Sequence, residues 1–386
     1  MIKIIDKRDC CGCTACASIC PHSAITMEPD SLGFCYPKVH PEKCVECGLC
    51  EKVCAFHKEY NRYDNYQEPF VYGCRHKDIK ELESSQSGAL ATAIMQKFLE
   101  KRGVVYGVSY DSGLNIIHKR ATSLSECLAF KGSKYVQSDL TDVFKSVLND
   151  LKNGERVLFL GTPCQVAGLK SYIPSKYHNE LLLVDNVCHA VNSPAIWKSY
   201  CEWLEKKYSK KIVKTDFRDK SFGWHSHLET LTFEDNSSVS RESFKNLFYD
   251  HLIVRRSCSS CFFTNFDRVS DITVGDFWGW ENNHSDWCDN NGVSLALINS
   301  PKGEQFFTSL QNLIDTVPSS TLECVQPQLC HPIGIDEKKL EDVEKRFMRR
   351  GYYSIALKYG DAGFHQASRT VIKLLKLVCR RIGIRK

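Results

Sequence analysis

The stretch CCGCTACASICP, from Cys10 to Pro21, places five cysteines within twelve residues. Four of them follow the order C-x2-C-x2-C-x3-C with a proline directly after, and residues 44–55, CVECGLCEKVCA, repeat that spacing. In a run of this kind, three cysteines bind one 4Fe–4S cluster and the fourth binds a second cluster. The sequence therefore predicts two clusters. The expected ligands are Cys10, Cys13, Cys16 and Cys54 for the first cluster, and Cys20, Cys44, Cys47 and Cys50 for the second.

Zinc is the alternative for closely spaced cysteines, but a structural zinc site takes four ligands, usually as two C-x2-C pairs. Each run here has three close cysteines and a fourth one turn further on, and the run occurs twice. Cys11 is a spare thiol and Ala55 replaces the second proline, without changing the ligand count. Residues 1–58 thus resemble a two-cluster 4Fe–4S ferredoxin, an α+β fold whose task is one-electron relay.

Length and composition narrow the class of protein. At 386 residues, the chain is too long for one ordinary core, so we expect two or three units. Its start lacks the apolar core of a signal peptide, and no run of about 18 apolar residues is present, so we expect a cytoplasmic protein. In that reducing compartment, its 21 cysteines favour metal binding or catalysis over disulfides. A net charge of +5 is too small to indicate nucleic-acid binding.

After a polar linker at residues 59–70, helical and strand patterns alternate. Residues 138–154 have the apolar periodicity of a helix, and residues 157–160 form an apolar run typical of a buried strand. Such alternation predicts an α/β domain with a mixed, largely parallel sheet. The predicted fold is an α+β ferredoxin-like dicluster domain, then this α/β domain over residues 70–335, and a helical basic extension at 336–386.

A second group of cysteines follows the predicted strands of the α/β domain. Cys164 and Cys188 come directly after strands, at the carboxyl ends where open α/β sheets place their sites. Cys258 and Cys261 form a C-x2-C pair. Three interpretations stay open. The four thiols bind a third 4Fe–4S cluster, or Cys164 is a reactive thiolate while the pair binds something else, or all four are ordinary buried cysteines.

Seven strings are spread along the chain. They are SSQSGALAT (84–92), KGSKYVQSD (131–139), FLGTPCQVAGLK (159–170), VCHAVNSPAIW (187–197), FRDKSFGW (217–224), SCSSCFFTNFDRVSDITVGDFWG (257–279) and GVSLALINS (292–300). In their order and density, these strings resemble the family of coenzyme F-420 hydrogenase and dehydrogenase beta subunits. The resemblance covers about residues 70–335, with the ferredoxin-like unit fused in front.

The resemblance implies FAD beside a 4Fe–4S cluster, with electrons paired at the flavin and exchanged with an organic substrate. The implied ligands of this third cluster are Cys164, Cys188, Cys258 and Cys261. The implied flavin contacts are Ser87, Gly88, Lys131, Gly132, Ser133, Lys134, Tyr135, Gly161 and Thr162. The candidate catalytic residues on the substrate side are His189, Arg218, Lys220 and Asp276, with Trp224 and Arg268 beside them. For any single lysine among these, a solvated surface charge is the more common role.

The C-terminal tail RTVIKLLKLVCRRIGIRK, residues 369–386, has seven basic and no acidic residues. Its apolar residues Val371, Leu374, Leu375 and Val378 fall on one helical face. That pattern suits either contact with an anionic membrane surface, which would place the protein at the inner face of the membrane, or the packing of an ordinary helix.

These observations predict a cytoplasmic iron–sulfur flavoprotein oxidoreductase. It is expected to relay electrons between a ferredoxin or another redox protein and a small organic substrate, through 4Fe–4S clusters and FAD. The alternatives are a coenzyme F-420-dependent oxidoreductase, a non-catalytic electron-transfer subunit and a zinc-bound structural adaptor. Similarly fused relatives suggest a link to polysaccharide biosynthesis. The substrate and the direction of electron flow are left open.

Overall fold

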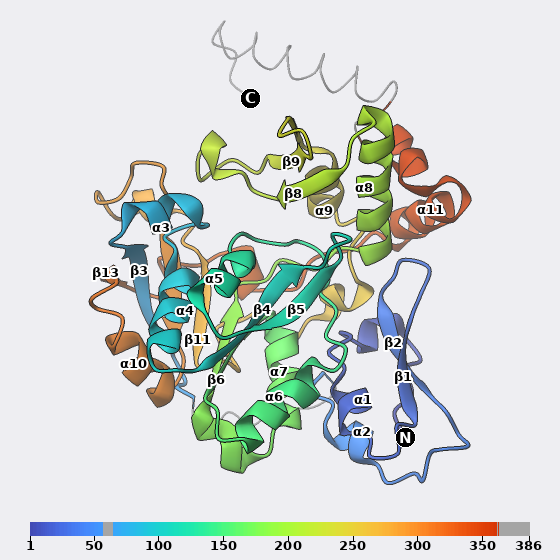
Figure 1. Ribbon diagram of the computed structural model, residues 1–386, viewed down its shortest axis with the longest axis horizontal. Helices are drawn as coiled ribbons and strands as arrows, with labels where there is room; N and C mark the ends of the chain where they lie inside the picture. The colour runs from blue at the N-terminus through green and yellow to red at the C-terminus, as the bar shows by residue number, and fades with distance from the viewer. Residues whose placement is uncertain (57–64, 361, 363–386) are drawn as a thin grey trace, which may run out of the picture.

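The computed structural model describes residues 1–56, 65–360 and 362. In Figure 1, an N-terminal unit drawn in blue lies beside a larger α/β body. Part of the linker expected at 59–70 lies outside the described residues, as does the whole basic tail at 369–386.

Two short helices and one hairpin make up the N-terminal unit. Helices α1 (Ala15–Ile19) and α2 (Leu49–Lys52) each begin inside a cysteine run. Strands β1 (Ile25–Pro29) and β2 (Cys35–Val39) pair antiparallel between the two runs. Since α1 and α2 contact each other, the repeat in the sequence is a repeat of loop and helix around one small core (Figure 1).

An eight-stranded sheet forms the centre of the body. In order across the sheet, its strands are β13 (Ile314–Ser319), β3 (Phe70–His76), β12 (Ser294–Ile298), β11 (Ile272–Asp276), β7 (Leu181–Asn186), β6 (Val157–Gly161), β4 (Val104–Tyr110) and β5 (Ile116–Ala121). The four central strands β11, β7, β6 and β4 are parallel, and antiparallel strands flank them on both sides. Parallel neighbours require crossover connections, which supply the helices that cover the sheet.

Helices cover both faces of this sheet. They are α3 (Ile79–Ser84), α4 (Leu90–Glu100), α5 (Leu124–Cys127), α6 (Val143–Lys152), α7 (Pro163–Tyr172) and α10 (Pro301–Thr308). Val157 and Phe159 of β6 belong to the core with α6 and α7, whereas Leu158 between them belongs to the core with α4 and α10. Successive side chains of a strand point to opposite faces, so one apolar run serves both layers. The N-terminal unit packs into the α6 and α7 side.

A smaller lobe lies at the top of Figure 1. Its elements are α8 (Pro194–Tyr208), β8 (Ile212–Asp216), β9 (Glu229–Phe233), β10 (Ser238–Arg241), α9 (Ser243–Tyr249) and α11 (Glu337–Lys358). The three strands form an antiparallel sheet, and Trp197, Tyr200 and Phe244 join the helices to it in one aromatic core. Helix α11 packs along α8 and is kinked at Gly351, which has a φ of 62°.

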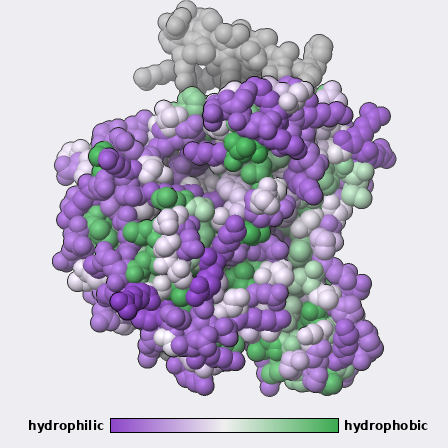
Figure 2. Space-filling view, viewed as in Figure 1, coloured by the Kyte–Doolittle hydropathy of each residue, from purple (hydrophilic) through white to green (hydrophobic). Residues whose placement is uncertain are grey.

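The predicted fold class is confirmed: an N-terminal α+β unit precedes an α/β domain with a mixed sheet whose centre is parallel. Within the described ranges, no helix is long and apolar enough to cross a membrane. Figure 2 shows a mostly polar face, with apolar residues in separate small groups, some of them over the N-terminal unit at the lower right.

Candidate functional site

Each cysteine run of the N-terminal unit folds as a loop with two left-handed residues. In the first run these are Gly12, with a φ of 73°, and Thr14, with a φ of 68°. In the second run they are Glu46, with a φ of 54°, and Gly48, with a φ of 73°. A left-handed residue other than glycine costs about 1–2 kcal/mol. Both loops nevertheless keep this curl at equivalent positions, which suits three ligands around one cluster.

The structure brings the first predicted ligand set together. Cys16 interacts with the thiols of Cys10, Cys13 and Cys54, and burial raises the pKa of Cys16. A buried thiol of this kind becomes a thiolate only when a cation compensates its charge. The four side chains therefore fit a cluster whose irons supply that charge.

The second predicted ligand set lies nearer the surface. Cys47 is exposed, Cys20 is half-buried and Cys50 is buried. The backbone N–H groups of Ala24 and Ile2 donate to the Sγ atoms of Cys20 and Cys50, each at 3.3 Å. Hydrogen bonds to cysteine sulfurs and solvent exposure are two of the factors that set the potential of an iron–sulfur cluster.

The cysteines of the α/β domain converge although they come from three parts of the chain. Cys164 lies in the first turn of α7 after β6, Cys188 follows β7, and Cys258 and Cys261 lie in and just after a turn at Arg256–Ser260. Cys188 interacts with the other three thiols, and no described cysteine forms a disulfide. Burial raises the pKa of Cys258 and of Cys261 to about 12.

No three His, Cys, Asp or Glu side chains of the described residues converge tightly enough to hold a single metal ion. In a cuboidal cluster, each cysteine binds a different iron atom, so the ligands stand further apart than around one ion. Cys188 interacts with Cys164, Cys258 and Cys261, and each of these four thiols could bind a different iron of such a cluster.

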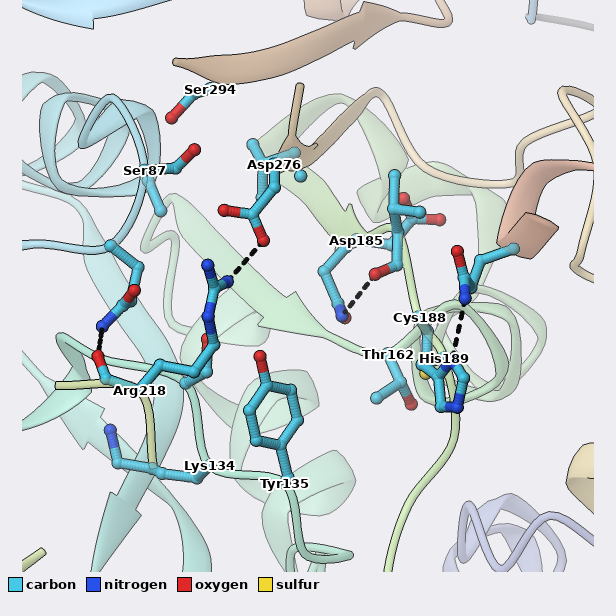
Figure 3. Close-up of a pocket in the computed structure, with 18 of the residues that line it drawn as sticks. Ser87, Lys134, Tyr135, Thr162, Asp185, Cys188, His189, Arg218, Asp276 and Ser294 are labelled. Carbon is cyan, nitrogen blue, oxygen red and sulfur yellow. Dashed lines mark hydrogen bonds and ion pairs between the residues drawn. The ribbon is translucent and has the colours of Figure 1, made fainter. Parts of the chain in front are cut away.

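A cavity of about 820 Å³ opens beside this third cysteine set. Its wall comes from the carboxyl ends of β6, β7 and β11, the turn before α4, and residues 130–138. Figure 3 shows Thr162 and Cys188 on one side of the cavity and Arg218 and Asp276 on the other. Because Cys188 belongs both to the cysteine set and to the wall, the two sites are adjacent. Cavities of this size hold small molecules and cofactors.

Eight of the nine predicted flavin contacts line this cavity. They are Ser87, Lys131, Gly132, Ser133, Lys134, Tyr135, Gly161 and Thr162. Gly161 is the last residue of β6, and Thr162 is the N-cap of α7. The backbone of this connection therefore lies against the cavity, and Cys164 follows in the first turn of α7.

The two lysines of the segment KGSK have different environments. Lys131 forms an ion pair with Glu81, so its charge is already compensated. Lys134 is half-buried, and its Nζ donates to the carbonyl oxygens of Lys131 and Gly132 at 2.9 and 3.1 Å. Burial lowers the pKa of Lys134 to about 7. An anion in the cavity would restore the full charge of Lys134, which makes this lysine the better partner for a pyrophosphate.

Gly88 and Lys220 stand behind the cavity wall. A Cβ added at Gly88 would lie 2.0 Å from the carbonyl oxygen of Cys74, so this glycine permits close packing of the turn on β3. Lys220 Nζ donates to the carbonyl oxygens of Ser85 and Ser87 at 3.0 and 2.9 Å. Neither residue lines the cavity: Gly88 permits close packing, and Lys220 braces the turn before α4.

An arginine and an aspartate face the cavity from opposite elements. The NH1 of Arg218 is 2.6 Å from Oδ2 of Asp276, and its NH2 donates to the Trp224 carbonyl oxygen at 2.9 Å. Trp224 Nε1 donates to the other oxygen of Asp276 at 2.8 Å. The buried Nε–H of Arg218 has no acceptor among the described residues. Arg218 lines the cavity, and the positive charge of its guanidinium suits an anionic or carbonyl-bearing substrate.

His189 and Arg268 extend the site toward the cysteines. His189 contacts His251 Nε2 through its Nε2 at 2.9 Å and Gln328 through its Nδ1 at 2.7 Å, and burial lowers the pKa of His189 to about 4. It is therefore neutral at pH 7. Arg268 forms a buried ion pair with Asp185 at 3.0 Å, which ties the segment after Cys261 to β7 rather than to a substrate.

Sequence reasoning missed residues that only the tertiary structure brings to the cavity. His227, Tyr249 and Trp278 line it, and Trp278 stacks on Trp224 with ring centroids 5.0 Å apart. No local pattern marks them. Arg255, which reaches from the body into the N-terminal unit, was also missed, although two arginines directly before the string SCSSC were an available signal.

Comparison with known proteins gives matches over both parts of the chain. Residues 154–319 match the family model that describes the C-terminal part of the beta subunits of coenzyme F420 hydrogenase/dehydrogenase, and residues 9–57 match the model of a 4Fe-4S dicluster domain. One of the subunits of the F(420)H(2) dehydrogenase of Methanosarcina mazei is 19% identical over 84% of this chain and 89% of its own length.

Other matches are partial or more distant. The coenzyme F-420-dependent sulfite reductase of Methanocaldococcus jannaschii is 26% identical over 46% of this chain, and the match spans 27% of that relative. A chain in a solved structure of the F-420-reducing NiFe hydrogenase complex from Methanosarcina barkeri aligns with 74% of this chain and 93% of its own, at 17% identity and a TM-score of 0.44. None of these names points to polysaccharide biosynthesis, and that expectation stays without support.

Proposed function

We propose that the chain is an iron–sulfur flavoprotein oxidoreductase, because residues 154–319 match the family model for the C-terminal part of coenzyme F420 hydrogenase/dehydrogenase beta subunits and residues 9–57 match that of a 4Fe-4S dicluster domain. It exchanges electrons between a redox protein and a small organic substrate. When bound, 4Fe–4S clusters supply one-electron steps and a flavin converts between one-electron and two-electron chemistry.

The observation that carries the proposal is the position of the third cysteine set. Cys188 interacts with Cys164, Cys258 and Cys261 and also lines the cavity. On its other side, Cys164 interacts with Cys11 of the N-terminal unit. A set of thiols between a cavity and a dicluster domain is what an electron relay into a cofactor site requires.

The cavity residues divide into a cofactor side and a substrate side. Lys134 and the turn at Ser87 would hold the pyrophosphate of FAD, and the backbone at Gly161 and Thr162 would lie against its ring system. Arg218, oriented by Asp276, would bind an oxygen of the substrate through its guanidinium. The names of two relatives include coenzyme F-420, so this coenzyme is the first two-electron partner to test.

The second ligand set, Cys20, Cys44, Cys47 and Cys50, lies nearest the surface and is called the outer cysteine set. It is the proposed site of electron exchange with a ferredoxin-type protein. Cys47 is exposed, and the neighbouring Val45 is 60% exposed. The rate of electron transfer between two proteins falls as the distance between donor and acceptor grows. A partner would therefore dock where a cluster lies nearest the surface.

Anaerobic purification followed by iron, sulfide and flavin analysis tests the proposal. We expect about twelve irons and one FAD per chain, because three cysteine sets would each hold four irons. Purified protein that contains FAD and reduces or oxidises coenzyme F-420 would identify that coenzyme as the substrate. About eight irons and no flavin would contradict the proposal and leave a two-cluster electron-transfer protein.

A further inference from the structure

Arg255 crosses from the α/β body into the N-terminal unit. Its side chain is 1% exposed. Nε donates to the carbonyl oxygen of Cys10 at 2.8 Å, NH2 to that of Cys35 at 3.0 Å, and NH1 to Oε1 of Gln137 at 2.8 Å. NH2 also lies 3.7 Å from Sγ of Cys10, a predicted ligand of the first cluster. The guanidinium is thus fixed by neutral oxygens beside a ligand sulfur.

No carboxylate in the described part of the chain balances this buried charge. None of the Asp or Glu side chains that the structure describes forms an ion pair with Arg255, and the groups with the strongest electrostatic influence on it are Tyr36, Cys10, Cys11 and Cys258. The guanidinium lies over the Tyr36 ring, 4.3 Å from its centroid. An unpaired buried charge is strongly unfavourable, so the fold implies a negative partner at this place.

Two cysteine sets meet around Arg255. The Cys11 thiol interacts both with Cys13 of the first set and with Cys164 of the third. The loop before α1, which carries Cys11 and Cys13, is in close contact with α7, since a Cβ added at Gly168 of α7 would lie 2.7 Å from Sγ of Cys13. Arg255 influences Cys10 of the first set and Cys258 of the third. It therefore stands at the boundary between both sets.

We propose that Arg255 is the shared counter-charge of the cluster held by Cys10, Cys13, Cys16 and Cys54 and of the cluster held by Cys164, Cys188, Cys258 and Cys261. For the second of these clusters, the inference rests on the proposed function. Four thiolates give each cluster a net negative charge, and reduction adds one more electron. A fixed positive charge in a dry site favours the reduced form and so raises the reduction potential. Arg255 is a positioning residue that tunes potential.

The test is a potentiometric titration of the iron-loaded protein followed by electron paramagnetic resonance. Arg255→Gln removes the charge. Gln137→Glu leaves the arginine in place and gives it a carboxylate at the atom that already accepts its NH1. Arg255→Lys keeps the positive charge but removes the planar guanidinium with its several N–H donors. The matched control is Arg256→Gln, because the adjacent Arg256 is paired with Glu337 and Glu344.

We expect two of the three midpoint potentials to move to more negative values in Arg255→Gln and in Gln137→Glu, while the third stays. Arg255→Lys and Arg256→Gln should titrate like the wild type. Full iron content with unchanged potentials in both Arg255→Gln and Gln137→Glu would overturn the inference. If Arg255→Gln and Gln137→Glu lose iron, the iron content of Arg255→Lys decides. Retention of iron in Arg255→Lys would support a requirement for positive charge, and loss of iron in Arg255→Lys would overturn the inference.

Iron content of the wild type separates this inference from the proposed function. About eight irons per chain would reject the third cluster. In that case the role of Arg255 toward Cys10 still predicts a negative shift of one of two potentials in Arg255→Gln. A wild type with about twelve irons and an Arg255→Gln variant with unshifted potentials would reject Arg255 alone.

Discussion

Lys131 and Lys134 show how two identical residues in one short segment acquire different chemistry. Lys131 is neutralised by Glu81, whereas half-buried Lys134 has only carbonyl oxygens as hydrogen-bond partners for its Nζ among the described residues. Charge-assisted hydrogen bonds are worth about 1.5–3 kcal/mol each. The segment KGSK therefore offers one lysine, not two, for an anionic cofactor.

We expect Lys134→Met to weaken FAD binding by the flavin-depleted protein roughly tenfold to a hundredfold, as the loss of one such bond implies. In the empty site the pKa of Lys134 is about 7, so the amine is charged below that pH and neutral above it. Wild-type affinity for FAD should accordingly fall as pH rises from 6 to 9. Fluorescence titration with FAD measures both effects.

Lys131→Met is the control for this prediction, because it removes a cation from the same segment that Glu81 already neutralises. It should keep both the wild-type affinity and its pH dependence. Equal weakening by the two substitutions, or a pH dependence that persists in Lys134→Met, would show that Lys134 does not bind the cofactor.

Helix α7 is the element that joins the two parts of the molecule. Its N-terminal turn carries Cys164, and its Gly168 faces Cys13 of the N-terminal unit. The absence of a side chain at Gly168 allows this approach. An alanine in a helix is normally more favourable than glycine by about 1 kcal/mol. Gly168 therefore lowers the intrinsic stability of α7 but permits the close approach of Cys13.

We expect Gly168→Ala to destabilise the iron-loaded protein by about 1 kcal/mol net, because the cost of overpacking, about 1–3 kcal/mol, exceeds the gain in propensity. The added Cβ would lie 2.7 Å from Sγ and 2.8 Å from Cβ of Cys13. The loss should be smaller in iron-free protein, where Cys13 is free to move. Chemical unfolding followed by tryptophan fluorescence measures both values.

Ser171→Ala on the exposed side of the same helix is the matched control, since it changes propensity without contacting a cysteine. If Gly168→Ala proves as stable as Ser171→Ala in the iron-loaded protein, the contact between α7 and the first cysteine set is not tightly packed.

At the scale of the whole molecule, the three cysteine sets run from the surface to the cavity. The outer set includes the exposed Cys47, the first set contains the buried Cys13 and Cys16, and the third set shares Cys188 with the cavity wall. This order gives the molecule two functional ends: a surface where a protein partner exchanges electrons and a pocket where an organic molecule does.

We expect Cys47→Ser to lower the rate at which a reduced ferredoxin reduces the protein by at least roughly tenfold, about 1.4 kcal/mol of activation free energy. Photoreduction of the flavin by a small reductant that enters the cavity should be unchanged. Stopped-flow absorbance separates the two rates. Cys288→Ser, at another exposed cysteine, is the control. Unchanged reduction by ferredoxin in Cys47→Ser would place the entry point elsewhere.

Local spacing in the sequence was sufficient to predict the dicluster unit. Three of the four ligands of each cluster are separated by only two residues, so the pattern of Cys10, Cys13 and Cys16 is recognisable without knowledge of the fold. The alternation of helices and strands likewise predicted the α/β class, because the period of buried side chains is a local property. A family resemblance added the predicted flavin contacts, of which Lys134 and Thr162 lie in the wall of the cavity.

Only the tertiary structure decided the roles that depend on residues far apart in the chain. Lys220 and Gly88 carry the family pattern, yet one braces a turn and the other permits close packing, because their neighbours come from β3 and the turn before α4. The convergence of Cys164 with Cys258, and the burial of Arg255 between two cysteine sets, require the sheet order and the docking of the N-terminal unit. Sequence determines short-range geometry, whereas burial and charge balance arise from contacts that no local pattern contains.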